Sequence, residues 1–276
     1  MRLWLTLFLS LPLVALLALL AGRSCAGPDR ARLNGGGSTF VEPIMKRWSS
    51  AFRGLTGVTV DYQGTGSGNG IQQMTEKTID FGCTDAPMTA EQTAKAEAIG
   101  GPVVHVPLVI GSVAVVYNLP GVSELKLTGP VLADIYLGNI TVWNDAAIAE
   151  LNPGVALPDL AIAPVYRAES SGTTNVFKEY LGKVSEEFRR RFPASTAPTW
   201  TPGVGSGEKG NGGVANRVKD NAGTVGYVEL TYATQNQIPV ALLRNRAGRF
   251  VAPTPGAVTA AAEAAMGEEP KAEPYT

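Results

Sequence analysis

Residues 166–177, YRAESSGTTNVF, combine an arginine, an acid two positions later, and a run of serine, glycine and threonine. Three kinds of chemistry use such a combination: a nucleophilic serine, a loop that holds nucleotide phosphates, and a site for a small anion. In an anion site, Arg167 would offer two parallel hydrogen bonds to an oxyanion and Glu169 would hold the guanidinium in place. An exposed Arg–Glu pair of little energetic value would use the same two residues.

The catalytic and nucleotide-binding alternatives lack the other residues that they need. The sequence has no G-x-S-x-G motif, and a serine triad also needs a histidine base. The single histidine, His105, lies in the β-rich run VVHVPLVI, where a packed strand residue is its commoner role. There is no P-loop motif, and the G-x-G-x-x-G match at 205–210 follows no clear strand. One histidine and one cysteine beyond the N-terminal segment leave no zinc cluster, so we expect no metal, no cofactor and no enzyme.

Four glycine-rich segments share one construction, a strand end followed by Gly, Ser or Thr and then a helix start; they are 35–43, 64–70, 167–174 and 205–213. Free backbone amides and the helix dipole favour an anion at such a helix start. Any one segment alone is more often an ordinary capped turn. Four of them in one α/β chain favour an anion site.

Asp85, in DFGCTDAPM, is an unexpected residue beside an anion. A carboxylate repels an anion unless the anion carries a proton that it can donate. Phosphate carries such a proton at neutral pH and sulfate does not, so an ionised aspartate would accept phosphate and reject sulfate. The simpler role for Asp85 is that of a helix cap before APMTAEQ.

Six segments together resemble, in order, the periplasmic phosphate-binding protein of the phosphate ABC transporter: GGGSTFVEPIMKRW, VDYQGTGSGNGIQQ, DFGCTDAPM, DIYLGNITVWND, YRAESSGTTNVF and GEKGNGGVA with GTVGYVE. The resemblance covers residues 33–259. It implies an α/β fold of the type II periplasmic-binding-protein class, with two lobes that close over one desolvated phosphate. It also implies delivery of that phosphate to membrane permease subunits.

Carried over residue by residue, the resemblance assigns the phosphate ligands to Thr39, Phe40, Ser67, Asp85, Arg167, Ser171, Gly172 and Thr173. Glu169 would position the arginine, at a place where family members usually have Asp. The alternatives are a binding protein for sulfate or molybdate, a hydrolase that uses Ser67 or Ser171, and a non-functional remnant.

The elements that would position these residues alternate between strands and helices, as in α/β layers. We expect a signal peptide over 1–26, a first α/β lobe over 33–110, a second over 111–250, and a C-terminal helix and tail over 251–276. We expect helices over 43–55, 88–100 and 173–181, among others, strands over 58–62 and 160–166, and β-rich runs over 102–111 and 112–119. Residues 27–34 are predicted as a polar linker. Relative to the family, the first lobe is expected to lack its closing strand and C-terminal helices.

Composition and the N-terminal segment predict where the chain works. With 45% hydrophobic residues and a formal net charge of −1, the chain is globular and gives no reason to expect nucleic acid as a partner. The apolar run after Arg2 predicts export, by a signal cut after Ala26 or by a retained membrane anchor. Lipidation of Cys25 is not favoured, because Arg23 stands where a lipoprotein signal needs a small apolar residue. We expect a monomer in the periplasm or at the cell surface.

Overall fold

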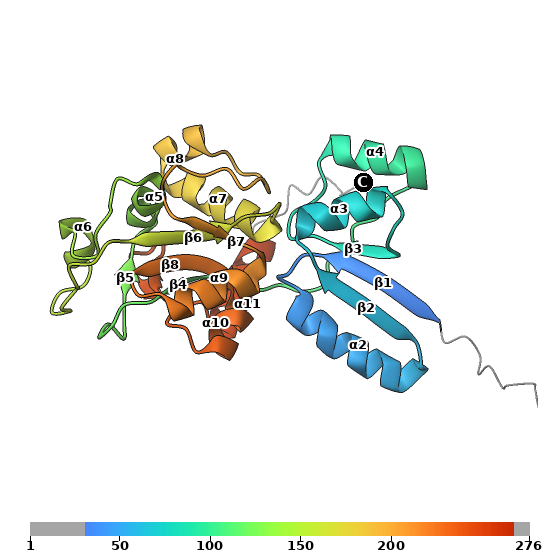
Figure 1. The fold of residues 1–276 in the computed structure, drawn as a ribbon, viewed down its shortest axis with the longest axis horizontal. Helices are drawn as coiled ribbons and strands as arrows, with labels where there is room; N and C mark the ends of the chain where they lie inside the picture. Colours follow the sequence, from blue (N-terminus) through green and yellow to red (C-terminus); the bar gives the residue numbers. More distant parts are fainter. Residues whose placement is uncertain (1–30, 268–276) are drawn as a thin grey trace, which may run out of the picture.

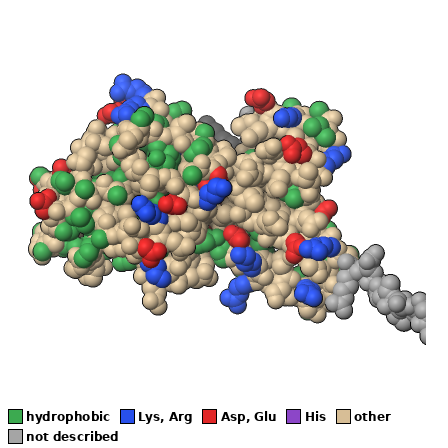
Figure 2. All heavy atoms as spheres, viewed as in Figure 1, with side chains coloured by type: hydrophobic (Ala, Val, Ile, Leu, Met, Phe, Trp, Pro, Cys, Tyr) green, Lys and Arg blue, Asp and Glu red, His purple; other side chains and the backbone are tan. Residues whose placement is uncertain are grey.

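The computed structural model describes residues 31–267, in two α/β parts that lie side by side (Figure 1). The expected signal segment 1–26, with Cys25, and the last part of the tail lie outside these residues. The part with the blue and cyan elements contains β1 to β3 and α2 to α4; the other contains all elements from β4 onward. Basic and acidic side chains are interspersed over the visible face, which therefore shows no large patch of one charge (Figure 2).

The sheet of the first part has three parallel strands in the order β2-β1-β3, formed by Arg32–Gly37 (β1), Thr59–Gly64 (β2) and Phe81–Cys83 (β3). The prediction of a polar linker through residue 34 is wrong, because β1 already begins at Arg32. Its polar start belongs to the central strand and is bonded from both sides: Arg32 forms an ion pair with Asp61 of β2, and the Asn34 amide donates to Asp80, next to β3 (2.7 Å).

Helices cover both faces of this sheet, with Glu42–Thr56 (α2) on one face and Ser67–Thr75 (α3) and Ala90–Gly100 (α4) on the other (Figure 1). The helix expected over 43–55 is confirmed: Pro43 lies in its first turn and Gly57 ends it in the left-handed conformation. The helix expected over 88–100 is confirmed as α4, which begins with a capping box: the Thr89 and Gln92 side chains each accept the other's backbone N–H.

The β-rich prediction for 102–111 is wrong, because residues 102–112 have no regular secondary structure. Apolar composition alone does not make a strand; the backbone also needs a neighbour to pair with, and no described strand pairs with this segment. Val104, Val106 and Ile110 are exposed as a result.

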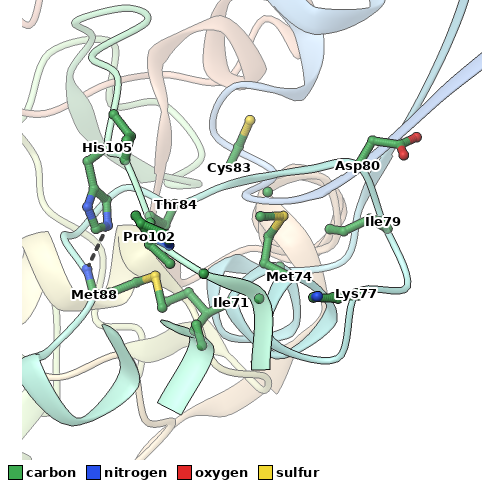
Figure 3. Close-up of a pocket in the computed structure, with 17 residues that line it drawn as sticks. Ile71, Met74, Lys77, Ile79, Asp80, Cys83, Thr84, Met88, Pro102 and His105 are labelled. Carbon is green, nitrogen blue, oxygen red and sulfur yellow. Dashed lines mark hydrogen bonds between the residues drawn. The ribbon is translucent and has the colours of Figure 1, made fainter. Parts of the chain in front are cut away.

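A cavity of about 300 Å³ lies between this segment and α3, β3 and α4 (Figure 3). Its labelled lining is largely apolar and includes Ile71, Met74 and Met88. His105 lies at its edge, where its Nε2 accepts a hydrogen bond from the Met88 amide (3.3 Å). The single histidine is therefore bonded inside the first part and belongs to no packed strand.

The second part contains a four-stranded sheet in the order β4-β8-β6-β7 and a small sheet in the order β10-β9-β5. Strand β4 runs antiparallel to β8, while β6 is parallel to both β8 and β7. The strands are Val113–Tyr117 (β4), Lys126–Leu127 (β5), Ala163–Arg167 (β6), Ser206–Glu208 (β7), Thr224–Glu229 (β8), Leu242–Arg244 (β9) and Phe250–Val251 (β10). The helices are Gly129–Leu137 (α5), Ala146–Ala149 (α6), Gly172–Val184 (α7), Glu186–Arg191 (α8), Gly210–Asp220 (α9), Leu230–Asn236 (α10) and Pro255–Gly267 (α11).

The larger apolar core lies in the second part. Aromatic rings meet at its centre, where Phe177 stacks on Tyr227 with ring centroids 4.2 Å apart and Trp200 packs against both. The first part has a much smaller core around Val41, Met45 and Tyr62. None of the helices within residues 31–267 is long and apolar enough to cross a bilayer.

Candidate anion site

The candidate residues lie at the carboxyl ends of strands from both parts. Ser38 directly follows β1, Asp85 comes two residues after β3, and Arg167 is the last residue of β6. Parallel neighbouring strands end at the same edge of a sheet, and ligands of open α/β sheets bind outside this edge. Three helices also begin near this region: α3 after β2, α7 after β6 and α9 after β7. Gly172 at the start of α7 contacts Ser67 at the start of α3, and the Gly210 amide at the start of α9 donates to Glu169.

Arg167 is held rigidly although its side chain is only 1% exposed. Its Nε donates to Glu169 Oε1 (2.9 Å), its Nη2 donates to the same oxygen, and the Gly210 amide does so as well (3.0 Å). The Arg167 backbone N–H donates to the Tyr227 hydroxyl (3.2 Å). Because Glu169 engages Nε and Nη2, the remaining guanidinium nitrogen, Nη1, faces Thr173 Oγ1 at 3.4 Å.

The Asp85 side chain connects the first part to the first turn of α7. Its Oδ1 accepts from the Ser38 hydroxyl and its Oδ2 from the Thr173 hydroxyl (3.1 Å). Burial raises the pKa of the Asp85 carboxyl; the hydrogen bonds from Ser38 and Thr173 and the positive charge on Arg167 oppose this rise. An acidic group is thus drawn to the N-terminus of α7, as expected for a site that favours negative charge.

The two parts approach each other closely at Gly172. A β-carbon there would lie 2.6 Å from Ser67 Oγ and 2.7 Å from the Asp85 β-carbon. Ser67 Oγ accepts from the Asp85 amide (3.4 Å), and Ser171 Oγ caps α7 by accepting from the Thr174 amide (3.2 Å). Only glycine at position 172 permits this approach.

The structure therefore brings the sequence-predicted residues into one region. Those joined by direct hydrogen bonds or close contact are Ser67, Asp85, Arg167, Glu169, Gly172 and Thr173. Ser171 and Thr39 are buried beside them. The Phe40 amide lies next to the group but donates to Ser38 Oγ (2.9 Å).

Two residues of this region, Ser38 and Asn211, were not predicted from the sequence. Ser38 precedes Thr39 in the same glycine-rich segment, so its hydroxyl was as good a candidate as that of its neighbour. Asn211 lies in the glycine-rich segment 205–213, whose sequence gives no sign of which of its residues faces the site. Its Nδ2 donates to Thr39 Oγ1 (2.8 Å). The two residues are 172 positions apart, so no local sequence pattern predicts this contact.

Comparisons with known proteins agree with this architecture. The family model described as "PBP superfamily domain" matches residues 24–275. The phosphate-binding protein PstS of Pasteurella multocida is 44% identical over 255 residues, which are 92% of this chain and 72% of that protein. The chain belongs to the PstS family of the PBP superfamily.

Two further comparisons show how much of each similar protein this chain covers. The phosphate-binding protein PstS of Xylella fastidiosa (strain Temecula1) is 44% identical over 233 residues, which are 84% of this chain but 62% of that protein. A solved high-affinity periplasmic phosphate-binding protein, PfluDING with bound phosphate, superposes with a TM-score of 0.69 at 24% identity, covering 83% of this chain and 67% of that one. At this identity the likeness shows the fold. The predicted fold class, α/β with the periplasmic-binding-protein architecture, is confirmed.

Proposed function

We propose that the chain binds inorganic phosphate between its two parts and delivers it to an ABC permease. The observation that carries the proposal is the meeting of Asp85 and Arg167, from different parts, at one hydroxyl. Thr173 Oγ1 donates to Asp85 Oδ2 (3.1 Å) and accepts from Arg167 Nη1 (3.4 Å). One guanidinium nitrogen, a carboxylate acceptor and the first turn of α7 therefore meet at this hydroxyl. The names of the relatives, phosphate-binding protein PstS, agree with this reading.

The carboxylate favours phosphate over sulfate or molybdate. Asp85 is surrounded by protein groups, and an unprotonated oxyanion beside it would meet like-charge repulsion from the carboxylate. Phosphate avoids this cost because it donates its proton to the carboxylate. The aspartate therefore acts as the specificity-determining group.

The arrangement supports binding without catalysis, in keeping with relatives that are binding proteins. A nucleophilic serine needs a base within hydrogen-bond reach. Ser171 Oγ accepts from the Thr174 amide and Ser67 Oγ from the Asp85 amide. Within residues 31–267 neither serine has a histidine among its hydrogen-bond partners, since His105 is bonded to Met88.

Delivery to a permease, export and a monomeric state complete the proposal. The resemblance to PstS proteins and the apolar N-terminal segment 1–26 support action in the periplasm or at the cell surface. Phosphate is the ligand; no cofactor or metal forms part of the proposal.

Equilibrium dialysis against labelled phosphate tests the proposal. We expect saturable retention by the wild-type protein and a loss of affinity of about a hundredfold or more in Arg167→Ala, because charge-assisted hydrogen bonds are among the strongest in proteins. Arg246→Ala, which removes an exposed arginine, is the matched control and should bind as the wild type does. Folded wild-type protein that retains no phosphate would overturn the proposal.

A further inference from the structure

Asn211 is a polar side chain without solvent exposure that joins the two parts of the molecule. It lies in the first turn of α9, in the second part, and contacts Thr39 of the first part. Its backbone N–H donates to Thr39 Oγ1 (3.1 Å) and its side-chain Nδ2 donates to the same oxygen (2.8 Å). Two donors from one residue thus converge on a single hydroxyl.

The orientation of the Asn211 amide is fixed by a third contact. The backbone N–H of Glu229 donates to Asn211 Oδ1 (2.9 Å). A backbone N–H can only donate, so the oxygen of the amide must face Glu229 and its NH₂ group must face Thr39. The alternative amide orientation would place two donors against each other.

This arrangement determines the direction of the Thr39 hydroxyl proton. A hydroxyl has two acceptor lone pairs and one proton to donate. Both Asn211 nitrogens are donors without a free lone pair, so they take up the two acceptor positions and cannot receive the proton. Among the hydrogen bonds of the described residues, Thr39 Oγ1 has no acceptor for its proton. The hydroxyl is left as a donor for a ligand oxygen.

The backbone around Thr39 is held from the same side. The Tyr232 hydroxyl donates to the Thr39 carbonyl (2.7 Å), and the amide of Gly210, next to Asn211, donates to Glu169 (3.0 Å). The start of α9 is thereby tied both to Thr39 and to the acid that holds Arg167. A shift of α9 would move both sides of the candidate site.

We infer that Asn211 is a positioning residue that makes the Thr39 hydroxyl an obligate hydrogen-bond donor to the bound anion. The inference rests on the proposed phosphate function. Asn211 thus sets the direction of the Thr39 hydrogen bond, which is more than holding the two parts together. A residue that only held the parts together could equally well accept the Thr39 proton.

Asn211→Asp separates the two roles. The carboxylate keeps the shape and still accepts from the Glu229 amide, but its second oxygen accepts the Thr39 proton. The link between the parts persists while the donor to the anion is lost. The added negative charge weakens phosphate binding as well, so the same substitution is repeated in a Thr39→Val background, where the charge effect remains and the hydroxyl effect vanishes.

The measurement is a double-mutant cycle of phosphate affinity by titration calorimetry, with thermal unfolding of each variant without phosphate as a check of folding. We expect Asn211→Asp to weaken binding about tenfold or more beyond its effect in the Thr39→Val background, the value of one hydrogen bond to a charged group. Asn245→Asp, which adds the same charge at an exposed turn and keeps its acceptor for the Arg249 amide, is the control. It should leave affinity unchanged.

Two results would overturn the inference, and they are distinguishable. If wild-type protein binds phosphate and the two substitutions act additively, Asn211 does not act through the Thr39 hydroxyl, while the proposed function stands. If folded wild-type protein does not bind phosphate, the proposed function falls and the orientation role falls with it.

Discussion

Asp85 is the residue at which the electrostatics of the site are most restrictive. Its carboxylate is largely removed from solvent and accepts hydrogen bonds from Ser38 and Thr173, which lie on opposite sides of the contact between the two parts. Burial raises the pKa of the group, and the hydroxyl donors and Arg167 act against that rise. An anion that binds here must therefore donate a proton to the Asp85 carboxylate, or it is destabilised by repulsion from that carboxylate.

Asp85→Asn tests this role directly. The amide removes the charge that repels sulfate and keeps the shape of the side chain. We expect the phosphate affinity to fall about 10- to 100-fold and the preference for phosphate over sulfate to shrink, because the lost bond is one to a charged group. Competition of sulfate with labelled phosphate measures the preference; an unchanged ratio would show that Asp85 does not set it.

Arg167→Lys tests the fork geometry separately from the charge. Lysine keeps a positive charge but offers no planar pair of donors, and Glu169 loses the Nε and Nη2 contacts that fix the guanidinium. We expect a phosphate affinity between those of the wild type and Arg167→Ala, about tenfold below the wild type. Dialysis of the three proteins side by side provides the comparison. A lysine variant as tight as the wild type would mean that charge alone suffices.

The sequence predicts residues of this site well where the chemistry is local. The arginine, the acid two residues later and the hydroxyls that start α7 follow one another along the chain, so their proximity needs no knowledge of the fold. Asn211 could not be found this way, because its role depends on Thr39, 172 positions away, and on the Glu229 amide, which fixes its orientation.

Among the elements, the start of α7 is the place where this helix contacts the first part of the molecule. Ser171 caps this helix, and Gly172 leaves room for Ser67 and the loop of Asp85. Backbone amides in the first turn of a helix favour a bound anion.

Gly172→Ala should therefore impair binding without unfolding the chain. A β-carbon 2.6 Å from Ser67 Oγ and 2.7 Å from the Asp85 β-carbon forces the two parts to separate. We expect the phosphate affinity to fall about tenfold or more, from an overpacking cost of about 1–3 kcal/mol. Gly54→Ala, in α2 with no atoms within 4 Å of the added carbon, is the control. Equal affinity of the Gly172→Ala variant and the wild type would contradict this account of the contact.

Elements with caps, helical periodicity or alternating strand patterns were predictable, including the strands expected over 58–62 and 160–166. The start of β1 and the irregular run after residue 101 were not. The helix α4 follows from its capping box and α2 from its proline and spacing. The glycine-rich half of β1 carries no strand propensity; it forms because both β2 and β3 pair with it and the Phe81 ring packs against Gly35. The run 102–112 has strand composition but no described partner, so it stays irregular.

At the scale of the molecule, the second part holds the larger apolar core, and a buried lysine packs against its aromatic rings. Lys178, with no exposed surface, donates to the Ala197 carbonyl (2.8 Å) and Thr199 Oγ1 (3.0 Å), and its ammonium lies 4.9 Å from the Trp200 ring centroid. Burial lowers the pKa of Lys178 to about 8. The segment that it holds also supports the anion loop, since the Thr196 carbonyl accepts from the Ser171 amide (2.9 Å).

This lysine predicts a pH dependence of stability. An unfolded lysine has a pKa of about 10.4, so between about pH 8 and pH 10 the unfolded chain binds more protons than the folded one. Below this window the folded protein carries the full cost of a buried, charged Lys178. The Lys178 contribution to the free energy of unfolding therefore rises as the pH rises across the window. Lys178→Met should lack this rise.

Urea unfolding of both proteins across the same pH window measures the effect. Burial raises the pKa of the Cys83 thiol and works in the opposite direction, but it is common to both proteins and cancels in the difference. A wild-type-minus-variant difference that does not change with pH would show that Lys178 titrates as an exposed lysine does.

The proposed function requires that the folded protein binds phosphate and excludes sulfate. Titration calorimetry of the folded protein at neutral pH, first with phosphate and then with sulfate, tests it most directly. We expect saturable one-to-one binding of phosphate and no comparable heat with sulfate. Absence of phosphate binding, or sulfate binding of equal strength, would contradict it.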